Sequence, residues 1–157
     1  MATQDARFVA PFVLEYSYKR SLGPVLSRFM TALRDRQILG AQTQDGRVLV
    51  PPSEYDPDTG EATEGLVEVG PDGTVMSWCW VAEPTPDHPL KAPFAWALIK
   101  LDGADTSLLH AVGSSEEQLS SCARVTPRWR EERQGHIRDI ECFEVLPRAT
   151  TPRSPSP

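Results

Sequence analysis

Residues 94–113 read FAWALIKLDGADTSLLHAVG, and this stretch decides the fold. Its first half alternates, with Trp96 and Leu98 on one face and alanine, isoleucine or leucine on the other. Apolar residues on both faces predict a strand that is buried on both sides, or nearly so. Segment 102–105 has turn chemistry, so we expect residues 106–112 to return as the partner strand.

Strand-like segments lie on both sides of this hairpin. They are residues 66–69, 74–81, 122–129 and 135–145. The alternation in the second of them places Met76, Trp78 and Trp80 on one face. Four prolines make residues 83–93 a loop, and Ser114 and Ser115 precede an acidic pair typical of one capped helical turn. About five strands with this turn between the third and fourth predict a mainly β fold, a five-stranded OB-type barrel. A β-sandwich is the structural alternative.

An amphipathic helix is predicted over residues 24–36, ahead of these strands. Pro24 is tolerated in a first helical turn, and Val25, Phe29 and Leu33 recur at helical spacing. Two interpretations of this apolar stripe stay open: it covers the core of the chain, or it docks on another protein.

A small hairpin is predicted next, from residues 38–41 and 47–50, and Pro51-Pro52 ends it. The acidic, turn-rich residues that follow predict a surface loop. We therefore expect four parts. They are an extended arm at residues 1–20, a helix and ribbon at 21–64, an OB-fold domain at 65–146 and a disordered tail at 147–157.

Composition narrows the function classes. The 157 residues carry a formal net charge of −6, which argues against nucleic acid as the main partner. No apolar run approaches the roughly 20 residues of a membrane span, and no signal-peptide core precedes Phe8. We therefore expect a cytosolic protein. Each of the three cysteines lies in an apolar, strand-like run, which predicts buried free thiols. They are Cys79, Cys122 and Cys142.

Catalytic motifs are not found in the sequence. His88, His110 and His136 are far apart, with no metal-binding or nucleophile-activating spacing between them. His110 lies in an expected strand, where a hydrogen-bonded structural histidine is the default. His88, in the proline-rich loop, is a candidate partner contact. We expect no independent catalysis and assign no catalytic residue.

The order of helix, two-knuckle ribbon, Pro-Pro step and barrel resembles the acyl-CoA-associated zinc-ribbon/OB-fold family (the "DUF thirty-five" group). The resemblance covers roughly residues 20–146. The short sequence segments that carry the resemblance are ILGA at 38–41, DGRVLVPP at 45–52, GTV at 73–75, PFAWALIKLDG at 93–103 and CARV at 122–125.

The ribbon departs from the family at the metal site. In the family, two Cys-x-x-Cys-Gly knuckles hold tetrahedral zinc. Here Gln42, Asp45, Asp56 and Thr59 stand at the four ligand positions, although a glycine still follows each knuckle. Amide, carboxylate and hydroxyl groups are poor ligands for structural zinc. The family resemblance, together with the loss of the four cysteines, therefore predicts a degenerate, rubredoxin-like ribbon. We expect it to hold no zinc or other cofactor and to be held by packing.

The resemblance implies an accessory role. Family members form complexes with thiolase-like enzymes, including lipid-transfer-protein-type aldolases, in which the thiolase-like chain carries the catalytic residues. A noncatalytic subunit of such an acyl-CoA enzyme, in steroid or fatty-acid side-chain degradation, is the preferred function. The alternative is a free-standing module that binds single-stranded nucleic acid. A stand-alone thioesterase or hydratase lacks an acid/base pair in the sequence.

Two kinds of contact residue follow. Arg124, Arg128 and Arg130 are candidates for the phosphates of acyl-CoA, because guanidinium groups pair with phosphate; the alternative is a solvated face of arginines and glutamates. The expected partner surfaces are the helix, the ribbon and the proline-rich loop. The candidate interface residues are Val25, Phe29, Leu33, His88 and Trp96.

Overall fold

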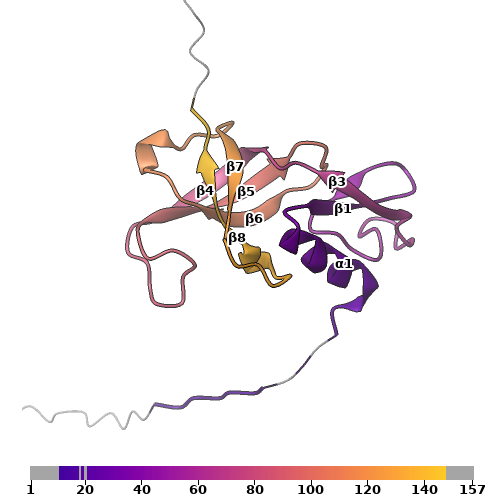
Figure 1. The fold of residues 1–157 in the computed structure, drawn as a ribbon, viewed down its shortest axis with the longest axis horizontal. Helices are drawn as coiled ribbons and strands as arrows, with labels where there is room; N and C mark the ends of the chain where they lie inside the picture. The colour runs from indigo at the N-terminus through magenta and orange to yellow at the C-terminus, as the bar shows by residue number, and fades with distance from the viewer. Residues whose placement is uncertain (1–10, 18, 20, 148–157) are drawn as a thin grey trace, which may run out of the picture.

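The computed structural model describes residues 11–17, 19 and 21–147, in which a barrel lies beside a small sheet and one α-helix (Figure 1). The elements in chain order are α1 (Gly23–Arg34), β1 (Ile38–Gln42), β2 (Val48–Leu49), β3 (Gly65–Val69), β4 (Gly73–Val81), β5 (Phe94–Leu101), β6 (Leu108–Val112), the 3-10 turn η1 (Glu116–Gln118), β7 (Arg124–Trp129), the 3-10 turn η2 (Ile137–Asp139) and β8 (Ile140–Val145). Most of the predicted arm, and the predicted tail from residue 148, lie outside the described residues. No helix in the described ranges is long and apolar enough to span a membrane.

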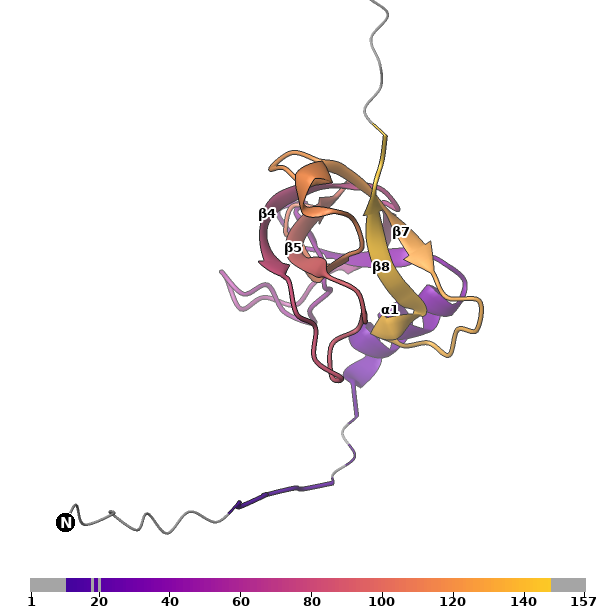
Figure 2. The same ribbon diagram turned by 90° about the vertical axis from the view of Figure 1, so that its left-hand side faces the viewer.

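Five strands close a barrel in the order β4-β5-β6-β8-β7, and Figure 2 shows them as a ring. All neighbours are antiparallel except β6 and β8, which pair in parallel. The turn η1 lies between the third and fourth barrel strands, where the sequence predicts a helical turn. This is the OB-type barrel that the sequence predicts, and the β-sandwich alternative is wrong.

The ribbon forms a separate three-stranded sheet with the order β2-β1-β3. Ile38 lies opposite Val69 and Gln42 opposite Gly65, so β3 pairs with β1 along its length. The third strand of this sheet therefore comes from residues expected in the OB-fold domain, and the domain boundary at residue 65 stays a prediction.

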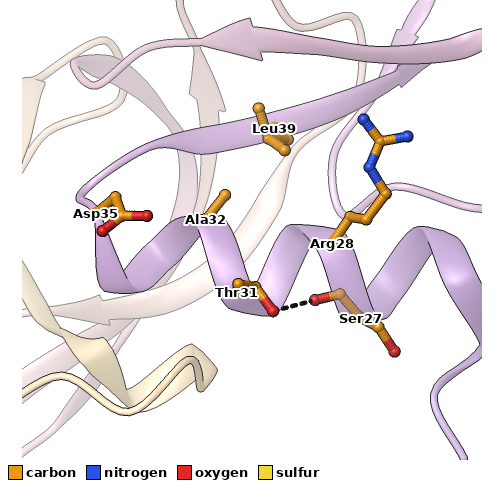
Figure 3. A pocket seen from close by; sticks show the side chains of 6 residues that line it. All are labelled: Ser27, Arg28, Thr31, Ala32, Asp35 and Leu39. Atoms are coloured by element: carbon orange, nitrogen blue, oxygen red, sulfur yellow. Dashed lines mark hydrogen bonds between the residues drawn. The ribbon is translucent and has the colours of Figure 1, made fainter.

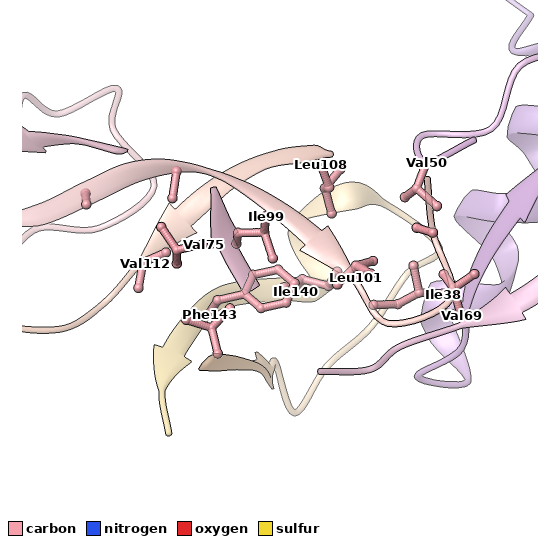
Figure 4. Close-up of a cluster of buried hydrophobic side chains, with 14 of the residues drawn as sticks. Ile38, Val50, Val69, Val75, Ile99, Leu101, Leu108, Val112, Ile140 and Phe143 are labelled. Carbon is pink, nitrogen blue, oxygen red and sulfur yellow. The ribbon is translucent and has the colours of Figure 1, made fainter. Parts of the chain in front are cut away.

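One hydrophobic core runs through both sheets. Figure 4 shows Ile38, Val50 and Val69 of the ribbon region at one end and Val75 and Phe143 of the barrel at the other, with Leu101 between them. All belong to one cluster of buried side chains. Burial of apolar area stabilises a fold by roughly 25 cal/mol per Å², so this shared core joins the ribbon to the barrel.

The helix is two residues shorter at its C-terminal end than predicted. It ends at Arg34, and Arg36 follows with a φ of 63°, a left-handed conformation that stops a helix. Phe29 and Leu33 are fully buried in the shared core. The helix stripe therefore covers the core of the chain itself, which was one of the two interpretations that the sequence left open.

Two irregularities in the strands break the predicted alternation. A bulge between Val75 and Ser77 shifts the register of β4, so Met76 is exposed while Trp78 and Trp80 pack against the core. The expectation that all three share a face is therefore wrong. The expected strand at residues 135–145 begins only at Ile140, because η2 takes up the residues before it.

Candidate functional site

The outer wall of β5 and β6 exposes apolar side chains. Leu98 lies directly opposite Leu109, and their exposed fractions are 41% and 59%. Met76 lies in the bulge of the adjacent β4 and is 51% exposed. Trp96, two residues before Leu98 on the same face of β5, is half-buried. We call Met76, Trp96, Leu98 and Leu109 the outer strip.

An aromatic series extends the outer strip to the proline-rich loop. The ring centroid of Phe94 lies 5.4 Å from that of Trp96 and 5.5 Å from that of His88, both in edge-to-face geometry. Phe94 is buried in a small cluster with Ala111 and Cys142, which Leu90 of the loop partly covers. The structure thus brings two predicted interface residues, His88 and Trp96, onto one surface.

The loop that carries His88 is ordered by its own hydrogen bonds. Nδ1 of His88 accepts from the main-chain N–H of Thr85 at 2.8 Å, and Nζ of Lys91 donates to the carbonyl of Pro86 at 2.6 Å. The loop protrudes from the end of the barrel remote from the ribbon (Figure 1). It therefore presents a shaped edge beside the outer strip.

The outer strip lies on the face that OB folds use for ligands, which is formed by the second and third barrel strands and the loop between the first two. Here those strands are β5 and β6, and the loop is the proline-rich one. Lys100 is the one lysine or arginine in β4, β5 and β6. The face is therefore apolar and nearly without positive charge. The sequence predicts β5 as buried on both sides, and this is wrong at Leu98.

Comparisons with known proteins show which proteins this barrel is similar to. A family model described as the C-terminal OB-fold domain of ChsH2 matches residues 66–130. The matched segment runs from β3 to the start of the β7–β8 loop, so this part of the chain is similar to that OB-fold family. The DUF35 relatives among solved structures agree with the predicted family resemblance.

Two solved structures share the fold. One is a DUF35-family protein of unknown function from Sulfolobus solfataricus, 23% identical, with a TM-score of 0.56, covering 67% of this chain and 78% of that one. The other is described as the Ltp2-ChsH2(DUF35) aldolase, 19% identical, with a TM-score of 0.59, covering 81% of this chain and 98% of that one. No curated protein matches the sequence.

The ribbon brings together two of the four positions at which the DUF35 resemblance implies zinc ligands. The guanidinium of Arg47 lies between them, 2.9 Å from Oδ2 of Asp45 and 2.7 Å from Oδ2 of Asp56. It also donates to Oδ2 of Asp58 at 2.7 Å. The side chains of Gln42 and Thr59 have no hydrogen bond to Arg47. No local sequence signal predicts that Arg47 contacts all three carboxylates.

Two of the three candidate phosphate-binding arginines, Arg124 and Arg128, are paired with acids of the same chain. Nη1 of Arg124 donates to Asp102 at 2.7 Å, and Nε of Arg128 donates to Glu141 at 2.9 Å. Arg128 and Arg130 line one hollow of about 590 Å³, but three glutamates line it too. They are Glu131, Glu132 and Glu141. These contacts support the alternative of a solvated face of mixed charge.

A second hollow lies between α1 and β1. Ser27, Arg28 and Thr31 of the helix line it together with Leu39 of the strand, as Figure 3 shows. The hydroxyl of Thr31 donates to the carbonyl of Ser27 at 2.8 Å, so that hydroxyl serves the helix. The hollow holds no acid/base pair. Val25 is half-buried on the same helix.

The buried titratable groups of the barrel have structural partners. Asp139 accepts from the main-chain N–H groups of Gln134, Gly135 and His136 at 2.7–3.1 Å. Burial alone would raise the pKa of Asp139, but these three donors outweigh it and lower the pKa. Nδ1 of His110 lies 3.4 Å from the carbonyl of Ala111, and burial lowers the pKa of this histidine. The structural role expected for His110 agrees with this geometry.

The cysteines differ from the prediction. Only Cys142 is buried, and burial raises the pKa of its thiol. Cys79 lies on the outer face of β4, opposite Trp96 of β5. Cys122 lies just before β7 and has a φ of 75°. Both are exposed. The prediction fails because apolar neighbours in sequence do not show which face of a strand a side chain occupies.

Proposed function

We propose that this chain is a noncatalytic accessory subunit that docks on a thiolase-like enzyme acting on acyl-CoA. The outer strip carries the proposal: an OB ligand face that is exposed, apolar and nearly uncharged. Contiguous exposed apolar side chains mark surfaces that bind other proteins, and aromatic residues and methionine are enriched in interfaces.

The comparisons support the kind of partner. The description of the Ltp2-ChsH2(DUF35) aldolase names two components, Ltp2 and ChsH2, and the DUF35 component shares the fold of this chain. We propose that the enzyme bound by this chain belongs to the thiolase-like class and supplies the catalytic groups. Steroid and fatty-acid side chains are the acyl groups to test.

The residues of the barrel support a noncatalytic role. A general acid or base must reach its substrate. Asp139 and His110 are instead buried and bonded to the main chain. The half-buried histidine of the loop, His88, packs edge-to-face on Phe94. It suits a contact within an interface.

The same face disfavours the nucleic-acid alternative. Binding of single strands depends on phosphate neutralisation along a basic groove. Lys100 alone supplies a lysine or arginine to β4, β5 and β6, and Arg124 and Arg128 at the neighbouring β7 are paired with acids.

A binding experiment with matched variants tests the proposal. The chain is co-expressed with the thiolase-like protein encoded nearest to it, and the affinity of the purified pair is measured. Leu98→Asp and Leu109→Asp should each weaken binding by about tenfold or more, as expected for interface residues that contribute over 1 kcal/mol. Ser121→Asp is the control, because Ser121 is exposed before β7, outside the outer strip and outside the expected partner surfaces.

Each outcome decides the matter. Loss of affinity in the strip variants alone, with thermal unfolding unchanged, supports the docking surface. No complex with the wild-type chain, or equal affinity for all variants, overturns it. Tight binding of a labelled single-stranded oligonucleotide at low salt would favour the alternative function.

A further inference from the structure

The guanidinium of Arg47 contacts two of the four positions at which the family has zinc ligands, and a third carboxylate beside them. Its three nitrogens donate to three carboxylates: Nε to Asp45, Nη2 to Asp56 and Nη1 to Asp58. Asp45 belongs to the first knuckle and the other two belong to the second. One cation therefore joins the two turns.

The donor set at this place does not fit structural zinc. Zinc of this class is held by four thiolate or imidazole ligands, and here an amide, two carboxylates and a hydroxyl stand at those positions. The hydroxyl of Thr59 serves the main chain, because its Oγ1 accepts from the N–H of Glu61. The side-chain amide of Gln42 makes no hydrogen bond to Arg47. The geometry leaves Asp45 and Asp56 to the guanidinium.

Two of the three carboxylates that contact Arg47, those of Asp45 and Asp56, also shape their own turns. Asp45 accepts a hydrogen bond from the hydroxyl of buried Thr43, and that hydroxyl also lies 3.1 Å from the carbonyl of Arg47. Hydrogen bonds from Thr43 and Arg47 lower the pKa of Asp45. The first knuckle is therefore ordered by the same groups that bind the guanidinium.

The second knuckle is ordered through Asp56, whose side chain is only 5% exposed. Oδ1 of Asp56 accepts from the N–H of Asp58 at 2.9 Å, while Oδ2 accepts from Arg47. The main chain closes the turn with bonds from Gly60 to Asp56 and from Asp56 to Glu61, both 2.8 Å. One oxygen of Asp56 thus builds its turn and the other connects it to the first knuckle.

We infer that Arg47 is the cross-link of this ribbon and replaces the metal. A planar guanidinium with donors on three nitrogens can bind three carboxylates at once. The charge pattern of a zinc site, a central cation among anions, is kept, with the cation supplied by the chain. This inference adds an ion cluster to the packing that the sequence predicts for the ribbon, and it does not rest on the proposed partner.

Hydrogen exchange tests the inference. The readout is the exchange rate of the amides of Thr43, Gly46, Asp56 and Gly60, which close the two turns. Arg47→Met should speed their exchange by about tenfold or more, because local opening then needs less free energy, while amides of β5 and β6 stay unchanged. Arg28→Met is the control, since Arg28 is exposed and has no ion pair in the described part of the chain.

Two further measurements separate the ion cluster from a metal. Raising NaCl to 1 M, which shortens the screening length to about 3 Å, should speed exchange in both knuckles of the wild-type chain. A chelator should leave exchange unchanged, and metal analysis should find no stoichiometric zinc. If Arg47→Met fails to fold, Asp58→Asn removes one exposed partner and should give a smaller increase. Unchanged exchange in both variants, or stoichiometric zinc with opening by chelator, would overturn the inference.

Discussion

Arg133 holds the end of the helix through the main chain of Arg34. Its Nε donates to the carbonyl of Arg34 at 2.7 Å, and Nη2 of Arg34 donates in return to the carbonyl of Gln134 at 3.1 Å. Carbonyls in the last turn of a helix lack intrahelical donors, and a cation there also meets the negative end of the helix dipole. The pair therefore joins α1 to the loop between β7 and β8.

Replacing Arg133 should loosen this junction. We expect Arg133→Ala to lower the free energy of unfolding by about 1–2 kcal/mol, because a charge-assisted hydrogen bond to a helix-end carbonyl is lost. Denaturant titration measures the change. Arg130→Ala, in the same loop, should change stability by less than about 0.5 kcal/mol. Equal losses in the two variants would contradict a specific role for Arg133.

Gly73 should tolerate no side chain. A Cβ there would lie 2.8 Å from the carbonyl oxygen of Lys100 and 2.9 Å from Cγ2 of Ile99. Because the oxygen belongs to the main chain of β5, Gly73→Ala should cost about 1–3 kcal/mol by overpacking. Gly65→Ala, with open space around its Cβ, is the matched control for thermal unfolding. A Gly73→Ala chain as stable as the control would show that the strands shift apart easily.

Asp139 should stabilise the fold only while it is ionised. Its three main-chain donors lower its pKa in the native state, so its contribution is present above the unfolded pKa of about 3.9 and is lost as the pH falls through the native pKa. We expect Asp139→Asn to lose about 1–3 kcal/mol at pH 7, and the difference from the wild-type chain should shrink as the pH falls below about 3.9. Asp87→Asn, exposed in the proline-rich loop, controls for loss of one carboxylate. A difference that stays constant with pH would refute this account.

His110 should make the fold sensitive to mild acid. Burial lowers its pKa below 6.5, so the unfolded chain binds a proton that the native chain rejects. Stability from this group is therefore complete above pH 6.5 and declines as the pH falls below it. Unfolding curves from pH 7.5 to 5.5 should show this decline in the wild-type chain and a smaller one in His110→Gln. An equal decline in the wild-type and His110→Gln chains would contradict this account.

The strands of the barrel could be predicted because their signals are local. The alternation in residues 94–101 and the turn after it come from neighbouring residues, and the same is true of the helix stripe around Phe29. The bulge at Met76 could not be predicted, since two strands must pair before one extra residue shows. An alternation without the bulge places Met76 and Trp78 on one face, although in the structure Met76 is exposed and Trp78 packs against the core.

The contacts of the candidate sites could not be predicted from the sequence, for a different reason. Leu98 and Leu109 look like core residues in sequence, and only the closed barrel shows that they point outward. Arg47 meets Asp56 and Asp58 across two turns, and Arg124 meets Asp102 from 22 positions away. Charged residues offer many pairings in a sequence, so the pairs that form depend on the tertiary structure.

The turn between β5 and β6 is bonded to the ribbon, not only to its own strands. Oγ1 of Thr106 donates to the carbonyl of Val50 at 2.9 Å, and the N–H of Asp105 donates to the carbonyl of Val48 at 2.8 Å. Together with the shared core, these bonds couple the two sheets, so neither sheet should unfold before the other. We expect the chain to denature cooperatively, with one calorimetric transition whose van't Hoff and measured enthalpies agree.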